Sequence, residues 1–147
     1  MIFEWRQWFI DYVNNNELEY ICGDETRELP RSYHWIGCSR DEVPFDDELD
    51  EYISGRIGHR QYVNTGYTLI KYGVGDYIGE HADYTGGNKV TYACELQASE
   101  CGTGLTVEGT PLTEGYFTNT MRHEVKPIKA GTRISLTMFG RKLTNII

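Results

Sequence analysis

Residues 132–139, TRISLTMF, alternate polar and apolar side chains, and this pattern indicates the fold. In an extended strand, successive side chains point to opposite faces of the sheet. Arg133, Ser135 and Thr137 are therefore predicted to share a polar face, while the residues between them form an apolar face. A strand of this kind fits the wall of a barrel that has a wet pocket inside and helices packed outside.

Six more short runs rich in Tyr, Thr, Val and Ile precede this strand, and Gly-containing turns separate them. They are QYVNTGYTLIKY (61–72), DYIGEHADY (76–84), KVTYACEL (89–96), GLTVEG (104–109), GYFTNT (115–120) and HEVKPI (123–128). Seven short strands at this density predict a β-sandwich or a β-barrel. We expect one domain, residues 1–147, with a support region of helices and loops (1–59) and a strand-rich core (60–140).

The support region is predicted to contain two helices. Residues 2–13 and 45–57 both repeat apolar residues at helical spacing, and the second run has acidic residues in its first turn, where they suit the helix dipole. Residues 17–45 mix Gly, Pro, charges and aromatics without a clear period. That segment is predicted to be a loop-rich connection that holds short strands at most.

Composition narrows the classes of partner and the compartment. The 147 residues suffice for a real core, and the net charge of −8 repels phosphate backbones, so we expect no nucleic-acid partner. The sequence shows no apolar run that would act as a signal peptide or a membrane span.

Its four cysteines form no C-x-x-C pair and are predicted to be reduced thiols in a cytoplasmic protein, although a disulfide between Cys94 and Cys101 is left as an alternative. We expect a monomer or a weak homodimer.

A metal site is predicted at His81-Ala-Asp83. Residues two apart on a strand point to the same face, so an imidazole and a carboxylate can reach one ion. His123, which opens the run HEVKP, is the natural third ligand. Two histidines and one carboxylate hold Fe(II) on one side and leave positions for substrate and dioxygen. An isolated H-x-D is a weak signal, and the prediction depends on the ordered set within a strand-rich chain.

A carboxylate receptor is predicted at Arg133, ten residues after His123. The segment between them is predicted to form a strand, a turn and a new strand, and a hairpin of that size would return Arg133 to the same cavity. A guanidinium there binds a carboxylate through two parallel hydrogen bonds. Ser135 or Thr137 could add a hydroxyl contact from the same face, and Tyr72 could donate its phenol hydrogen to the same acid.

Three segments together carry a resemblance to a known family: YTLIKYGVGDYIGEHADYTGGNKVTYACEL (67–96), GTGLTV (102–107) and HEVKPIKAGTRISLTMF (123–139). They resemble the catalytic core of the iron(II)- and 2-oxoglutarate-dependent oxygenases. Tyr-Gly-x-Gly before H-x-D, and H-E-V-x-P-x-x-x-G-T-R near the end, are typical of its prolyl 4-hydroxylase-like branch. The resemblance implies a mainly β fold with packing helices (α+β), a double-stranded β-helix or jelly roll of the cupin-like type.

The resemblance also implies roles for individual residues. It assigns Fe(II) to three ligands: His81, Asp83 and His123. It assigns the distal carboxylate of 2-oxoglutarate to Arg133, with further contacts to this cosubstrate from Tyr72 and Thr137. The implied reaction consumes O2, releases succinate and CO2, and is supported by ascorbate as a reductant. Because halogenating relatives carry a small residue at the carboxylate position, Asp83 favours hydroxylation.

The resulting hypothesis is a hydroxylase similar to procollagen-proline 4-dioxygenase, acting on a prolyl residue in a peptide or protein. Two alternatives stay open: a 2-oxoglutarate-dependent hydroxylase of another small molecule or side chain, and a jelly-roll module that binds metal without turnover. A nucleic-acid demethylase would need a basic groove, which the net charge disfavours. The sequence departs from the family at Cys94, where some relatives have a tyrosine, and at Gly102-Thr103-Gly104, where they have Gly-Gly.

Overall fold

The computed structural model describes residues 4–23, 29–57, 62–83, 89–118 and 120–142. The elements in chain order are α1 (Glu4–Asn15), β1 (Glu19–Cys22), β2 (Arg31–Cys38), a 3-10 turn (Arg40–Glu42), α2 (Asp46–Ile57), β3 (Tyr62–Tyr72), β4 (Tyr77–His81), β5 (Lys89–Gln97), β6 (Leu105–Val107), β7 (Thr110–Pro111), β8 (Glu114–Thr118), β9 (His123–Val125) and β10 (Arg133–Lys142). All seven strands predicted from the sequence are present, and so are both predicted helices.

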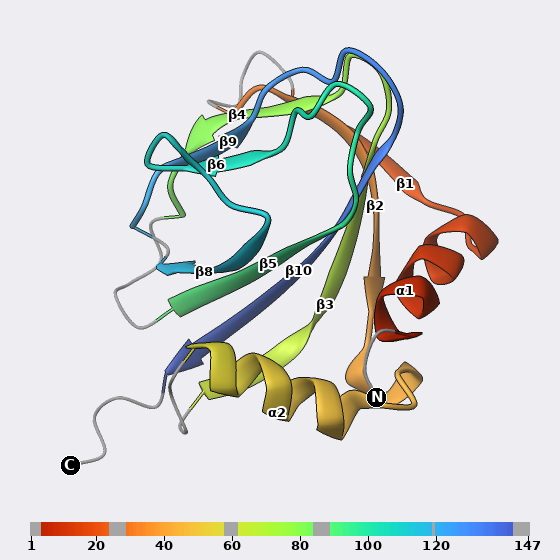
Figure 1. Ribbon diagram of the computed structural model, residues 1–147, viewed down its shortest axis with the longest axis vertical. Helices are drawn as coiled ribbons and strands as arrows, with labels where there is room; N and C mark the ends of the chain where they lie inside the picture. The colour runs from red at the N-terminus through yellow and green to blue at the C-terminus, as the bar shows by residue number, and fades with distance from the viewer. Residues whose placement is uncertain (1–3, 24–28, 58–61, 84–88, 119, 143–147) are drawn as a thin grey trace.

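The ten strands of the described residues form one antiparallel sheet in the order β7-β6-β9-β4-β2-β3-β10-β5-β8, with β1 paired to β2. The sheet curls back on itself, so that β4, β9 and β6 form one layer and β3, β10 and β5 form the other (Figure 1). This half-open barrel is a jelly roll, or double-stranded β-helix. The predicted fold class, mainly β with packing helices, is therefore confirmed.

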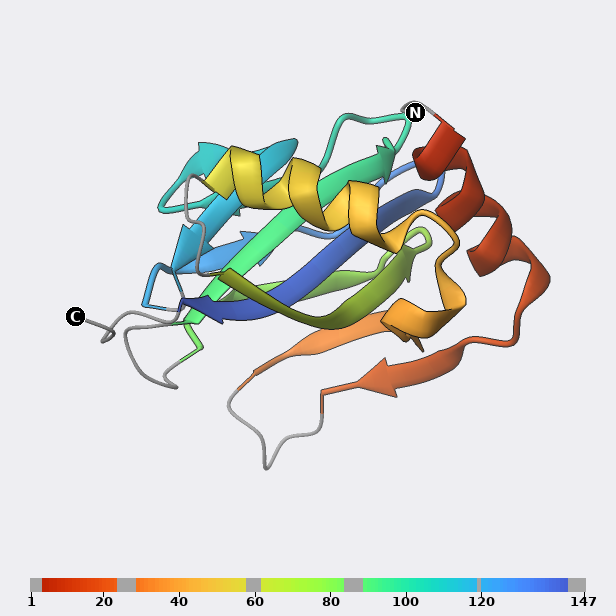
Figure 2. The ribbon, with the colours of Figure 1, turned by 90° about the horizontal axis from the view of Figure 1, so that it is seen from below.

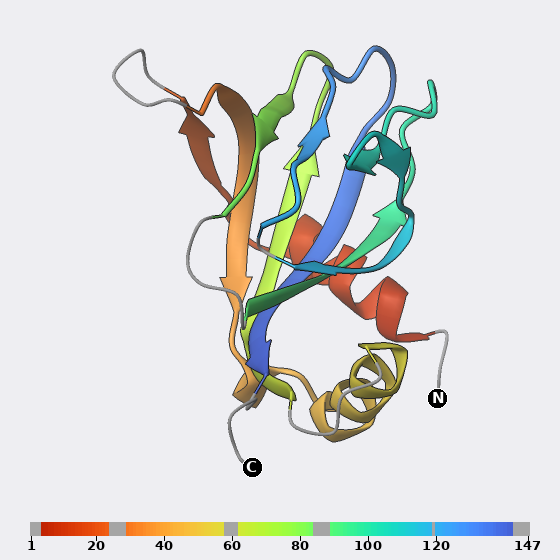
Figure 3. The ribbon, with the colours of Figure 1, turned by 90° about the vertical axis from the view of Figure 1, so that its left-hand side faces the viewer.

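Both helices pack on the outside of the curl, against the layer of β3, β10 and β5 (Figures 2 and 3). Apolar side chains of the helices and of the outer faces of these strands form what we call the outer core. Its buried members include Trp5, Phe9, Val13, Leu49, Ile53, Ile57, Tyr67, Leu69, Tyr92, Cys94, Ile134, Leu136 and Met138. Neither helix is long and apolar enough to cross a bilayer, and this holds for every helix in the described ranges.

The segment predicted to be loop-rich, residues 17–45, contributes β1 and β2. The second of these strands pairs with both β3 and β4, so it lies in the middle of the sheet. The sheet therefore includes a central strand from the predicted support region, residues 1–59. The strand escaped prediction because most of its residues are partly buried on both faces, which leaves no clean polar and apolar alternation.

The predicted hairpin between β9 and β10 is wrong. Strand β9 pairs with β4 and β6, whereas β10 pairs with β3 and β5, so the two lie in opposite layers of the curl. The connection crosses between the layers and turns at Gly131, which has a φ of 81°. An added Cβ there would lie 2.8 Å from the backbone nitrogen of Glu100, so the crossing requires glycine.

The four cysteines are free in the structure. Cys94 is buried in the outer core and Cys101 is exposed in the turn after β5, so the bridge between them is not formed.

Candidate metal centre and its cavity

A cavity of about 230 Å³ lies inside the curl, between the two layers of the sheet. It is lined by every site residue that the sequence predicted: Tyr72, His81, Asp83, His123, Arg133 and Thr137. These side chains come from β3, β4, β9 and β10 and from the segment after β4. The curl of the sheet therefore brings together residues that are up to 65 positions apart in the chain, as the span from Tyr72 to Thr137 shows (137 − 72 = 65).

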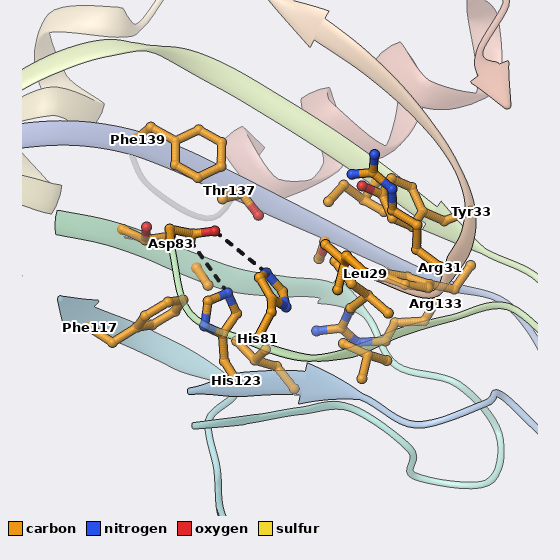
Figure 4. A pocket seen from close by; sticks show the side chains of 18 residues that line it. Leu29, Arg31, Tyr33, His81, Asp83, Phe117, His123, Arg133, Thr137 and Phe139 are labelled. Carbon is orange, nitrogen blue, oxygen red and sulfur yellow. Dashed lines mark ion pairs between the residues drawn. The ribbon is translucent and has the colours of Figure 1, made fainter. Parts of the chain in front are cut away.

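His81, Asp83 and His123 form the candidate metal centre. Each offers one ligand atom, and these atoms all lie within 4.8 Å of one another. The two histidines are register partners on β4 and β9, and their ring centroids are 4.1 Å apart. Asp83 lies two residues beyond the end of β4 rather than on the strand. Its two carboxylate oxygens still approach the two Nε2 atoms, each at 3.6 Å (Figure 4).

Backbone carbonyls hold both imidazoles in one tautomer. The Nδ1 atom of His81 lies 2.9 Å from the oxygen of Gly79, and that of His123 lies 3.0 Å from the oxygen of Met121. A ring nitrogen that faces a carbonyl carries its proton there, so each Nε2 atom directs a lone pair toward Asp83.

Electrostatics keep this donor set suitable for a cation. Burial of its ring, helped by the neighbouring His81, lowers the pKa of His123 and keeps its imidazole neutral at pH 7. Two imidazoles and one carboxylate whose ligand atoms lie this close together are a ligand set that Fe(II) accepts. The chemistry of the donors therefore fits the metal that the motifs predicted.

Arg133 reaches the cavity from the layer opposite the histidines. Its side chain is 3% exposed, and its Nε donates a hydrogen bond to Glu95 Oε1 at 2.9 Å. The guanidinium carbon lies 5.2 Å from the ring centroid of Tyr72, in cation–π range. Glu95 takes only the Nε–H, and the Nη groups carry further N–H donors that a bound carboxylate can use.

Two further predicted residues flank this arginine. Burial raises the pKa of Tyr72 far above its usual value, so its phenol stays protonated and can donate a hydrogen bond. Thr137 lies on the cavity face of β10, four residues beyond Arg133, and Ser135 lies buried between them on the same face. Both hydroxyls that the sequence left open as contacts therefore line the cavity.

The sequence did not single out Glu95 as the partner of Arg133. A signal for it exists in β5, where Thr91, Ala93 and Glu95 alternate with residues of the outer core. The same alternation places Cys94 on the outer side, 2% exposed, so its thiol is not part of the cavity wall. Arg31 of β2 also lines the cavity. The sequence did not identify it as a site residue, because β2 was not predicted as part of the core sheet.

Comparisons with known proteins address the fold. The chain matches no model of a known protein family, and none of the curated proteins matches it in sequence. Solved structures do match it. A prolyl-4-hydroxylase from Pseudomonas putida has a TM-score of 0.65 and 16% identity, over 97% of this chain and 88% of that one. The 2-oxoglutarate complex of a viral collagen prolyl hydroxylase from Paramecium bursaria Chlorella virus-1 has a TM-score of 0.63 and 15% identity, over 97% and 92%.

A third solved structure also matches the chain. It is the non-heme α-ketoglutarate-dependent carbocyclase SnoK from nogalamycin biosynthesis, with a TM-score of 0.66 and 10% identity, over 95% of this chain and 74% of that one. At these identities the similarity shows the fold alone. The chain has the fold of the 2-oxoglutarate and Fe(II) oxygenases, prolyl hydroxylases among them, which confirms at this level the resemblance that the motifs indicated.

Proposed function

We propose that this protein is an Fe(II)- and 2-oxoglutarate-dependent dioxygenase that hydroxylates a C–H bond and releases succinate and CO2. The observation that carries the proposal is the arrangement of one cavity, with a His-Asp-His donor set on one layer and Arg133 on the other. A protein that only stores metal needs the donor set alone. A buried guanidinium in the same cavity adds a receptor for a carboxylate, which 2-oxoglutarate supplies.

Each residue then has a defined task. Bound Fe(II) supplies the chemistry that couples the oxidative decarboxylation of 2-oxoglutarate by O2 to the hydroxylation of the substrate. His81 and His123 would hold the metal through Nε2 and Asp83 through its carboxylate, while the carbonyls at the two Nδ1 atoms keep the rings oriented. Arg133 holds the distal carboxylate of 2-oxoglutarate, with hydrogen bonds from Tyr72 and Thr137. Ascorbate as a supporting reductant belongs to the same proposal.

The favoured substrate is a prolyl residue in a peptide or protein, as for procollagen-proline 4-dioxygenase. Support comes from the Tyr-Gly-x-Gly and H-E-V-x-P motifs and from the fold shared with two prolyl hydroxylases. Phe139, which lines the cavity and is 48% exposed, offers an aromatic surface for a pyrrolidine ring where the cavity meets solvent.

A small-molecule substrate is the second candidate. The cavity of about 230 Å³ is smaller than the roughly 300–1,000 Å³ of drug-sized ligand sites and also takes 2-oxoglutarate in this proposal, so the part of a substrate that enters it must be compact. The fold shared with SnoK, an enzyme of nogalamycin biosynthesis, supports the same candidate.

The test measures succinate formed from 2-oxoglutarate with Fe(II) under air, with proline-containing peptides and free amino acids as candidate substrates. We expect a peptide to stimulate succinate release and to gain one oxygen atom on proline in its mass spectrum. His123→Ala should abolish the stimulation. His34→Ala is the matched control, because the His34 ring contacts Tyr20 at a tilt, with 4.9 Å between ring centroids, and His34 is not part of the cavity wall.

Other outcomes decide against parts of the proposal. Stimulation by small molecules, with none by peptides, would favour the second candidate. Metal binding without any binding of 2-oxoglutarate would indicate a non-catalytic jelly-roll module, and full activity in His123→Ala would exclude the assigned ligand set.

A further inference from the structure

Arg31 places a second guanidinium in the wall of the cavity. Its Nε atom is buried and has no hydrogen-bond partner in the part of the chain that the structure describes. Within the same described ranges, no carboxylate lies within ion-pair distance of its side chain. A buried N–H group without a partner is destabilising, so a buried donor of this kind is normally satisfied by a ligand or a water molecule.

Contacts place Arg31 at the same end of the cavity as Arg133. Tyr33, two residues farther along β2, shares the cavity face with Arg31, and its ring centroid lies 5.7 Å from that of Tyr72. The Tyr72 ring in turn lies 5.2 Å from the guanidinium carbon of Arg133. Figure 4 shows both arginines at the end of the cavity away from Asp83. Arg31 on β2 and Arg133 on β10 therefore both line this part of the cavity.

The charge of Arg133 alone does not match a bound carboxylate. Glu95 accepts the Nε–H bond of Arg133 at 2.9 Å, so the two side chains are close to neutral as a pair. A carboxylate taken from water into this cavity still needs a cation. Asp76, which accepts hydrogen bonds from the Ser32 hydroxyl and from the backbone N–H of Gly73, forms no ion pair with Arg31 among the described residues.

We propose that Arg31 and Arg133 together bind the distal carboxylate of the cosubstrate, with Arg31 supplying the positive charge that Glu95 offsets on Arg133. The inference rests on the proposed function, because it takes 2-oxoglutarate as the ligand. It makes Arg31 a residue that determines specificity: it selects 2-oxo acids that carry a second carboxylate.

The test compares two ligands that differ in that carboxylate. 2-Oxoglutarate and 2-oxopentanoate are titrated calorimetrically into the protein loaded with Mn(II), without O2, for the wild type and for Arg31→Gln. We expect Arg31→Gln to weaken 2-oxoglutarate by about tenfold or more and to change 2-oxopentanoate by less than about twofold. Arg31→Lys, which keeps the charge and loses the planar fork, should fall between the two.

A matched control removes the same charge elsewhere. Arg56→Gln, on α2 and outside the cavity, should leave both dissociation constants unchanged. Thermal melting of each variant establishes that it is folded before titration.

The remaining outcomes separate this inference from the proposed function. If the wild type binds 2-oxoglutarate and Arg31→Gln binds it equally well, the inference is wrong, the proposed function stands, and Arg31 is left to contact the substrate. Equal weakening of both ligands would also overturn the inference, because it indicates a general disturbance of the cavity. If the wild type binds neither ligand, the proposed function and the inference fail together.

Discussion

The two faces of β10 have different surroundings. Arg133, Ser135 and Thr137 line the cavity, whereas the alternate residues Ile134 and Leu136 are 1% and 0% exposed in the outer core. Strand β5 repeats this division between its own cavity face and outer face. Neighbouring positions on one strand therefore contribute separately to site chemistry and to stability, and substitutions at adjacent residues should have unlike effects.

The largest effect is expected on the cavity side at Asp83. Asp83→Ala removes the only carboxylate of the donor set, so substrate-dependent succinate release should fall to background and bound metal should be lost. Metal content and turnover measure the two effects. Glu80→Ala is a control in the same segment, since its side chain is 54% exposed and it is not part of the cavity wall. Normal turnover in Asp83→Ala would show that Asp83 is not a metal ligand.

The outer face should respond in stability instead. Leu136→Ala leaves a cavity in the outer core and should lower the free energy of unfolding by about 2–5 kcal/mol, measured by urea denaturation. Thr137→Ala, the next residue, should change the unfolding free energy by less than about 1 kcal/mol and weaken 2-oxoglutarate modestly. Large destabilisation by Thr137→Ala with none by Leu136→Ala would show that the two faces are assigned the wrong way round.

Arg133 tests the cavity face at its cosubstrate end. Loss of a charge-assisted hydrogen bond costs about 1.5–3 kcal/mol, so Arg133→Gln should raise the 2-oxoglutarate concentration for half-maximal turnover by roughly ten- to a hundredfold. That substitution also leaves the Glu95 carboxylate without its partner. The double variant Arg133→Gln/Glu95→Gln removes both charges, and it should recover stability without recovering 2-oxoglutarate affinity. Unchanged affinity in both variants would exclude Arg133 as the carboxylate receptor.

The smallest effect is expected at Glu95. Glu95→Gln keeps an oxygen that can accept the Nε–H of Arg133 and removes a negative charge from the same end of the cavity. Affinity for 2-oxoglutarate should therefore increase by about 1 kcal/mol, roughly fivefold, in calorimetric titration. Weaker binding would mean that the charge of Glu95, and not its hydrogen bond, is what positions Arg133.

Local pattern was enough to predict most of the secondary structure. The seven strands, both helices and the two faces of β10 follow from residue spacing, because the direction of a side chain depends on backbone geometry within a few residues. The set of cavity residues from Tyr72 to Thr137 was also predicted, since their order and strand-compatible spacing are visible in the chain. Their roles in binding iron and 2-oxoglutarate stay predictions until the variants are measured.

Two features of the site lay outside local pattern. Asp83 reaches the histidines from beyond the end of β4, so strand spacing does not explain its approach. Arg133 arrives from the opposite layer and not through a hairpin, because β9 and β10 pair with different neighbours. Both outcomes depend on pairing between distant strands, which no short window of sequence contains.

The sequence by itself determined which side chains share a face of each strand, and hence that β10 would have a polar face on one side and an apolar face on the other. That outcome is local, since alternation along a strand holds whatever the strand pairs with. Only the tertiary structure decided which polar groups meet across the cavity. The pairing of Arg133 with Glu95, and the cavity position of Arg31, whose Nε has no partner among the described residues, arise from the order of strands in the curled sheet. These side chains line or flank one cavity although they lie as many as 102 positions apart in the sequence (133 − 31 = 102).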